Sequence, residues 1–168
     1  MHPATSRNKL ILRRTITSLR WLLLVSTIGG GFVGFVTALQ AFSNLTSPTT
    51  YVLCVICVIL YCYIVISGLL FADNTEAVLP LWLALGAQVP WLSTPFFAYN
   101  LSSGFHYTIG SLNGHLITVH RFGCDFVVSL FNNRGWGVGI NVFAIVLMIA
   151  LGVCSHFTIT SLGHETSS

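Results

Sequence analysis

The sequence predicts an integral membrane protein that is mainly α-helical, with four transmembrane helices and a small three-stranded antiparallel β insert between helices 3 and 4. Composition is the first observation that predicts this class. Hydrophobic residues occupy 54% of the 168 positions and charged residues only 7%, against about 25% in an ordinary soluble domain. So few charged side chains cannot cover a soluble fold of this size, and a chain this apolar is not intrinsically disordered.

Four long apolar runs are the second observation. We predict transmembrane helices at residues 19–42, 51–72, 77–99 and 136–159, a basic N-terminus at 1–18, an extracytoplasmic β-rich segment at 100–135 and a polar tail at 160–168. A helix of about 22 residues covers about 33 Å, which suffices for a hydrocarbon core of roughly 30 Å. Pro90 and Pro95 predict a kink in the third helix, because proline removes a backbone donor.

Basic residues near the N-terminus predict the orientation in the membrane. Five of the seven basic residues precede or begin the first apolar run: Arg7, Lys9, Arg13, Arg14 and Arg20. A basic cluster that leads directly into a transmembrane helix is typical of the cytoplasmic side, and it argues against a nucleic-acid-binding arm. We therefore expect a multi-pass protein of the plasma or inner membrane, with a cytoplasmic N-terminus and no nucleic-acid partner.

The number of crossings stays open at this point. In the alternative, residues 77–99 form a re-entrant hairpin, and the chain crosses three times. That arrangement would bring Arg121 and Arg134 to the cytoplasmic side with the other basic residues, which the positive-inside rule favours. The length and apolar character of the third run favour a full crossing.

A β-hairpin is predicted at residues 105–122. Two β-rich runs, FHYTIGSL and HLITVHRF, flank Asn113-Gly114, and Asn-Gly is the strongest short-range hairpin signal. A two-residue turn would pair Leu112 with His115. One face then carries Phe105, Tyr107, Ile109, Leu116, His120 and Phe122, and the other carries His106, Thr108, Leu112, His115, Ile117, Val119 and Arg121. Residues 126–131 complete the predicted meander as its third strand.

Small residues recur every four positions in the first apolar run, at Ser26, Gly30, Gly34 and Ala38. This spacing puts them on one helix face, where small side chains let another backbone approach closely. We interpret the stripe as a helix-packing interface. It serves either contacts within the same bundle, which we favour, or contacts with a partner or a second copy of the chain.

Gln88 lies near the middle of the third run, just before Pro90 and Pro95. A buried amide in a membrane needs hydrogen-bond partners and should face the helix bundle. Together with the proline break, it could line a path for an ion or substrate. The simpler interpretation is one interhelical hydrogen bond and a structural kink.

Metal, cofactor and catalytic motifs are not predicted. Cys54 and Cys57 have CxxC spacing, but they lie inside an apolar run without the polar access that a redox or zinc site requires. A metal site outside the membrane could combine His106, His115, His120, Cys124 and Asp125, although their spacing is not diagnostic. No P-loop, GxSxG or HExxH signature occurs, so we expect no enzyme and no bound metal or cofactor.

These observations predict a small, non-enzymatic integral membrane protein that acts through protein–protein contacts. It could be an accessory or assembly subunit, or an immunity- or receptor-like binder. Besides the lipid bilayer, the predicted partner is another membrane protein or a second copy of the chain. The alternative is a small oligomeric channel or transporter that uses Gln88 and the break between Pro90 and Pro95.

Overall fold

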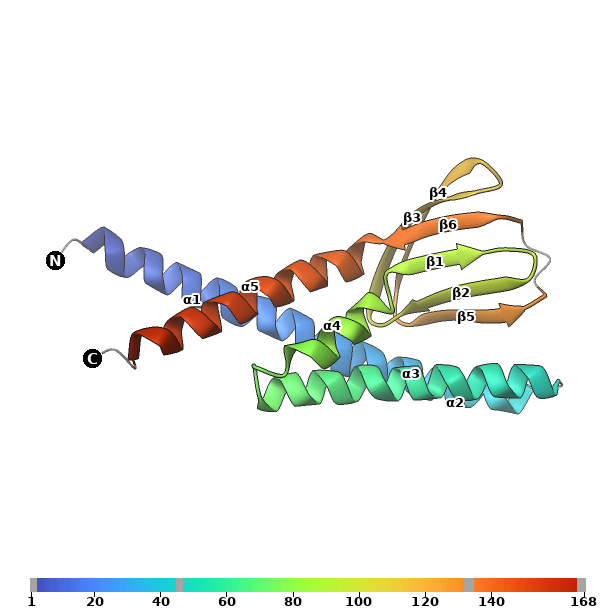
Figure 1. The fold of residues 1–168 in the computed structure, drawn as a ribbon, viewed down its shortest axis with the longest axis horizontal. Coiled ribbons are helices and arrows are strands. Elements are labelled where there is room, and N and C mark those ends of the chain that lie inside the picture. Colours follow the sequence, from blue (N-terminus) through green and yellow to red (C-terminus); the bar gives the residue numbers. More distant parts are fainter. Residues whose placement is uncertain (1–2, 45–46, 132–134, 166–168) are drawn as a thin grey trace.

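The computed structural model describes the backbone of residues 3–44, 47–131 and 135–165, and the side chains of residues 14–43, 47–131 and 135–156. In chain order the elements are a long helical hairpin, a short helix, six strands and a final helix. The helices α1 and α5 extend to one side of the molecule, and the sheet lies at the other side, along α2 and α3 (Figure 1).

The first helical rod consists of α1 (Pro3–Leu24), a π-helical turn (Val25–Gly29) and α2 (Gly30–Ala41), which follow one another without a break and end in a 3₁₀ turn (Phe42–Asn44). The helix α3 (Pro48–Asp73) returns beside α2. It begins with a proline in its first turn, where the missing N–H costs nothing. Two segments, Arg14–Ala41 and Pro48–Asp73, are long and apolar enough to cross a membrane.

The predicted third transmembrane helix is wrong, and the predicted fourth is helical only from Val142. The helix α4 (Val78–Gly86) has only 9 residues, which at 1.5 Å each is less than half of a hydrocarbon core of about 30 Å. The rest of the third run is strand, because Pro90 begins β1 (Pro90–Ser93) and residues 97–99 begin β2 (Phe97–Ser102). The fourth run starts as strand β6 (Gly137–Asn141), and α5 (Val142–Glu165) follows.

The β region is a six-stranded sheet and not a three-stranded insert. Its other strands are β3 (Phe105–Leu112), β4 (His115–Phe122) and β5 (Asp125–Leu130). The strand order is β4-β3-β6-β1-β2-β5, and every pair is antiparallel. The fold is therefore a helical hairpin and two further helices joined to an antiparallel sheet, which corrects the predicted four-helix membrane bundle.

The predicted hairpin is confirmed, with Leu112 opposite His115 and Phe105 opposite Phe122. Asn113 and Gly114 both adopt positive φ, 52° and 82°, as a type I′ turn requires. The predicted third strand exists, but it pairs with β2 and not with β4. The partner β2 was hidden from sequence reasoning, because its first residues were assigned to a helix.

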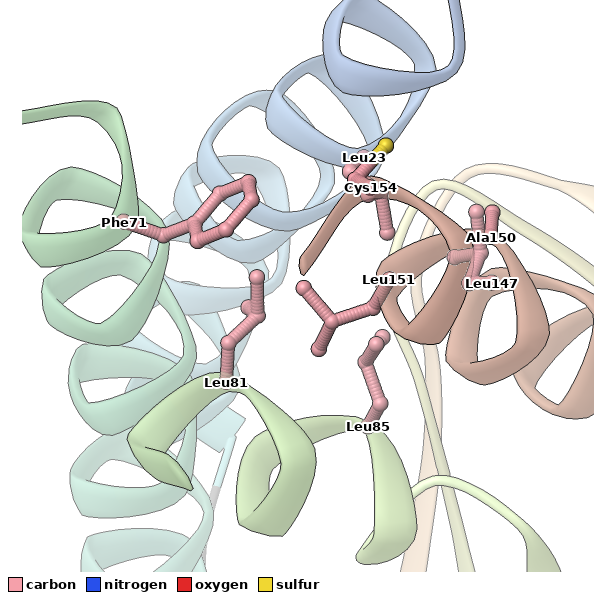
Figure 2. Close-up of a cluster of buried hydrophobic side chains, with 8 residues drawn as sticks. All are labelled: Leu23, Phe71, Leu81, Leu85, Leu147, Ala150, Leu151 and Cys154. Carbon is pink, nitrogen blue, oxygen red and sulfur yellow. The ribbon is translucent and has the colours of Figure 1, made fainter. Parts of the chain in front are cut away.

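Two hydrophobic cores hold these parts together. The first joins α1, α3, α4 and α5 through buried hydrophobic side chains, most of them leucines, and Figure 2 shows them converging: Leu23, Phe71, Leu81, Leu85, Leu147, Ala150, Leu151 and Cys154. The second joins α2, α3 and α4 to the sheet, with Tyr61 at its centre and Ala38, Cys57, Ile64, Ala84 and Leu101 around it.

Hydrogen bonds fix the sheet on the second core. The Tyr61 hydroxyl donates to Ser102 O at 3.0 Å, and the Tyr99 hydroxyl donates to Ala87 O at 2.6 Å. Burial, and secondarily the Cys57 thiol, raises the pKa of Tyr99 to about 12. Tyr99 therefore stays protonated at neutral pH and keeps its donor.

A candidate binding site on the sheet

The two faces of the sheet differ in what covers them. Tyr99, Leu101, Phe126 and Val128 point to one face, which packs partly on the helical hairpin. There, the rings of Tyr61 and Phe126 meet edge-on with centroids 6.0 Å apart. Because side chains alternate along a strand, the neighbouring residues point to the opposite face, which we call the pocket face.

A cavity of about 310 Å³ opens on the pocket face. Its lining comes from five strands: Trp91, Asn100, His106, Thr108, Val119, Arg121, Asp125 and Val127. Since β4 and β5 are the two outermost strands of the sheet, their joint presence means that the sheet curves around the cavity. One end of the curve is closed by a backbone hydrogen bond from Gly123 N to Gly104 O at 2.5 Å.

A carboxylate and an amide form the polar floor of this cavity. Asn100 is buried, and its Nδ2 donates to Asp125 Oδ2 at 3.0 Å. This hydrogen bond fixes the orientation of the carboxylate. A charged acceptor held in a half-buried pocket is available to a ligand that brings hydrogen-bond donors.

His106 lies beside this pair and is 1% exposed. Burial lowers the pKa of His106; Arg121 and His120 lower it further, and Asp125 opposes them. The imidazole is therefore neutral at pH 7. In that form, one ring nitrogen can donate a hydrogen bond and the other can accept one.

Ser102, His106 and Asp125 are the residue types of a catalytic triad, but their geometry serves the fold. The Ser102 side chain is 0% exposed. Its Oγ donates to Asp125 O at 3.3 Å, accepts from Asp125 N at 3.2 Å and lies 3.4 Å from His106 Nδ1. A hydroxyl used in this way joins β2 to β5.

Thr108 provides a polar group that the fold leaves unused. Its side chain is 2% exposed, and its hydroxyl has no hydrogen-bond partner among the described residues. A buried hydroxyl without a partner costs about 1–3 kcal/mol. A ligand in the cavity that supplies a donor or an acceptor would recover this free energy.

The outer strand β4 forms the rim of the site. Within the described residues it pairs only with β3, so its other edge is open. Val119 and Arg121 of β4 line the cavity. On the opposite face of the same strand, Leu116 is 80% exposed and Phe122 is 91% exposed.

The predicted small-residue stripe lies within the chain. Ser26, Gly30, Gly34 and Ala38 are all buried. A Cβ added at Gly30 would collide with the backbone of Gly104, and one added at Gly34 would collide with the Tyr61 ring. The stripe thus contacts α3 and the β2–β3 turn, which is the intramolecular alternative, and contact with a partner through it stays a prediction.

Gln88, Pro90 and Pro95 have local roles. Gln88 is buried; its Nε2 donates to Ala84 O at 3.1 Å, and its Oε1 accepts from Ser103 N at 2.9 Å and Ser103 Oγ at 2.8 Å. Pro90 begins β1, and Pro95 is exposed in the turn after it. The predicted helix kink is therefore a helix end, and the channel alternative stays an untested prediction.

The basic residues of the topology signal divide into three groups. The side chains of Arg7, Lys9 and Arg13 lie outside the described residues. Arg14 is exposed. Arg20 is half-buried, and its Nη2 donates to Ala72 O at 2.7 Å, close to the last turn of α3.

The histidines and cysteines do not form a metal site within the described part of the chain, where no group of three or more suitable ligands occurs. His106 and His115 share the pocket face, as the hairpin predicted, and His120 points to the other face. Cys124 Sγ donates to Thr37 Oγ1 of α2 at 3.3 Å.

Sequence reasoning found part of this site. The hairpin alternation already put His106, Thr108, Val119 and Arg121 on one face. Asp125 was grouped with His106 only as a possible metal ligand, and Trp91, Asn100 and Val127 were not grouped with them. Polar residues at positions 100 and 102, alternating with apolar ones, were the available signal for strand β2.

Comparison with known proteins yields no family model that matches the chain and no match among curated proteins or solved structures.

Proposed function

We propose that this chain is a non-enzymatic membrane protein that acts by contact with another protein, and that the partner adds a strand to the open edge of β4. The observation that carries the proposal is this eight-residue edge strand, which has apolar side chains on one face and a polar cavity on the other. The receptor-like class of function fits it best.

The membrane anchor in this proposal is the helical hairpin. Arg14–Ala41 and Pro48–Asp73 cross the bilayer in opposite directions. Basic residues precede the first crossing, so the N-terminus lies in the cytoplasm. The protein is then multi-pass, and the loop between α2 and α3 is extracytoplasmic.

The sheet lies alongside the second half of this anchor. Gly104 meets Gly30, Cys124 meets Thr37, and Phe126 meets Tyr61. These contacts hold the sheet near the apolar surfaces of α2 and α3. If the open edge of β4 were in hydrocarbon, each unsatisfied backbone group would cost several kcal/mol.

If the edge of β4 faced water instead, water could satisfy its backbone groups, but Leu116 and Phe122 would remain exposed on the same strand. A long, exposed and hydrophobic edge strand is a template for pairing with another chain. A partner strand would satisfy the backbone edge and cover these side chains at the same time. Strand addition of this kind is an established mode of peptide recognition.

Charge favours a different protein over a second copy. The strand β4 carries Arg121 on its pocket face and has no Asp or Glu. A second β4 would therefore offer no counter-charge to Arg121. The proposed partner segment is extended and carries an acidic residue that reaches Arg121 at the rim of the cavity.

The test is photo-crosslinking in native membranes, with a photoreactive residue at Thr118, which is exposed in the middle of β4. The matched control is the same residue at Leu69, on the exposed surface of α3. We expect one discrete protein adduct from position 118 and none from 69, and we expect Arg121→Glu to abolish it.

An adduct of two copies of this chain would replace the proposed partner with a homo-oligomer. Equal labelling at positions 118 and 69, or no protein adduct at 118, would overturn the proposal.

A further inference from the structure

A second cavity, of about 480 Å³, lies at the other end of the helical hairpin. It is lined by Ile16, Thr17, Arg20, Trp21, Leu24, Phe71, Ala72, Thr75 and Cys154. Most of this lining is apolar, and one guanidinium group enters it. A cavity of this composition fits a ligand with an anionic group and a hydrocarbon part.

Arg20 is incompletely satisfied in this cavity. Its Nη2 donates to Ala72 O, but its Nε is buried and has no hydrogen-bond partner among the described residues. An anion in the cavity would supply the missing acceptor, and charge-assisted bonds of this kind are the strong ones. The nearest carboxylates in the sequence, Asp73 and Glu76, are exposed and do not line the cavity.

The position of the cavity along the two apolar segments indicates the class of ligand. One apolar segment begins at Arg14 and the other ends at Asp73, and the bond from Arg20 to Ala72 joins the two at this level. In a bilayer, these ends lie at the polar headgroups. Trp21 is 62% exposed at the same level, as tryptophans at the membrane interface are.

We propose that this cavity binds the phosphate of a membrane phospholipid, with Arg20 as the phosphate ligand and an acyl chain along Trp21, Leu24 and Phe71. The proposal rests on the membrane anchor and is independent of the sheet and its partner. Arg20 would then have two roles: its Nη2 bonds Ala72 O near the end of α3, and its other donors bind the phosphate. Arginine suits this role because its planar donors match phosphate geometry.

The experiment measures the phospholipid that the full-length protein retains after purification in mild detergent, by native mass spectrometry. We expect retained phospholipid in the unsubstituted protein and a loss of at least about tenfold in Arg20→Gln. The control is Arg14→Gln, which removes the same charge from an exposed position on the same helix and should retain the lipid.

Two further arms keep the test decisive. If Arg20→Gln does not fold, Arg20→Lys replaces it; lysine keeps the charge but lacks the Nε donor and the planar fork, so retention should still fall. Addition of inorganic phosphate should not displace the lipid, because inorganic phosphate has no acyl chain to contact the apolar lining of the cavity. Displacement by phosphate would show that the source of the anion is soluble, and it would overturn the lipid assignment.

Equal retention by Arg14→Gln and Arg20→Gln, or no phospholipid in the unsubstituted protein, would overturn the site itself. Extraction of the protein from membranes by alkaline carbonate would instead overturn the anchor, so failure of the two proposals can be told apart.

Discussion

The two ends of the helical rod use different kinds of packing. At the α1 end, Leu23 belongs to the same hydrophobic core as Leu147 and Leu151 of α5 (Figure 2). At the α2 end, Gly30 and Gly34 bring the rod into direct contact with the β2–β3 turn and the Tyr61 ring. The difference teaches that α1 and α5 associate through large side chains, whereas α2 approaches both α3 and the sheet closely through small residues.

The largest expected effect is truncation in the helical core. Leu151 is 0% exposed, and Leu151→Ala should lower the free energy of unfolding by about 2–5 kcal/mol, because it leaves a cavity. Denaturant unfolding in detergent measures this. The control is Ile149→Ala, whose side chain is exposed on the same helix; an equal loss in both variants would contradict the core assignment.

The next effect concerns the sheet end. Gly30→Ala should lower the free energy of unfolding by about 1–3 kcal/mol, because the new methyl group would collide with the Gly104 backbone. The control is Gly29→Ala, where nothing lies within 4 Å of the added methyl. It should be neutral or stabilise by up to about 1 kcal/mol. Identical behaviour of the two variants would contradict the close contact.

Gln88→Met should have an effect of similar size, confined to the sheet end. It leaves Ser103 N and Oγ without their acceptor, and an unsatisfied buried group costs about 1–3 kcal/mol. Hydrogen exchange at the Ser103 amide should accelerate, and exchange in α5 should not change. Unchanged exchange at Ser103 would show that Gln88 does not anchor the turn.

The smallest effect is a pH dependence from His106. Burial lowers its pKa below the ordinary value of 6.5. Between the lowered pKa and pH 6.5, the folded state therefore binds fewer protons than the unfolded state. Stability is then fully present above pH 6.5 and falls as the pH drops through and below it. Thermal unfolding between pH 5 and 8 should show this slope, and His106→Gln should flatten it. A slope that persists in His106→Gln would assign it to another group.

Local signals in the sequence predicted local structure well. Asn113-Gly114 and the alternation on either side of it gave the β3–β4 hairpin with its register and faces. Length and composition likewise gave two helices that fit a membrane. These features depend on residues that are neighbours in the chain.

Long-range pairing could not be predicted. Residues 77–99 are as apolar as a transmembrane helix, and the pairing of β1 with β6 joins Pro90 to Ile140, 50 positions later. Proline at the first position of a strand is compatible with a sheet, so Pro90 and Pro95 allowed both a kinked helix and a strand. The pocket was missed for the same reason, because Asn100 and Asp125 meet only through the β2–β5 pair.

The most direct test of the account is a disulfide across β1 and β6, the place where a helix was expected. Leu92 lies opposite Val138, and both side chains are exposed. In a chain without its native cysteines, Leu92→Cys with Val138→Cys should cross-link readily, because opposite residues of paired strands have Cα atoms about 4.5–5.5 Å apart. Leu92→Cys with Ile140→Cys, two residues out of register, should not. Cross-linking of both pairs alike, or of neither, would contradict the six-stranded sheet.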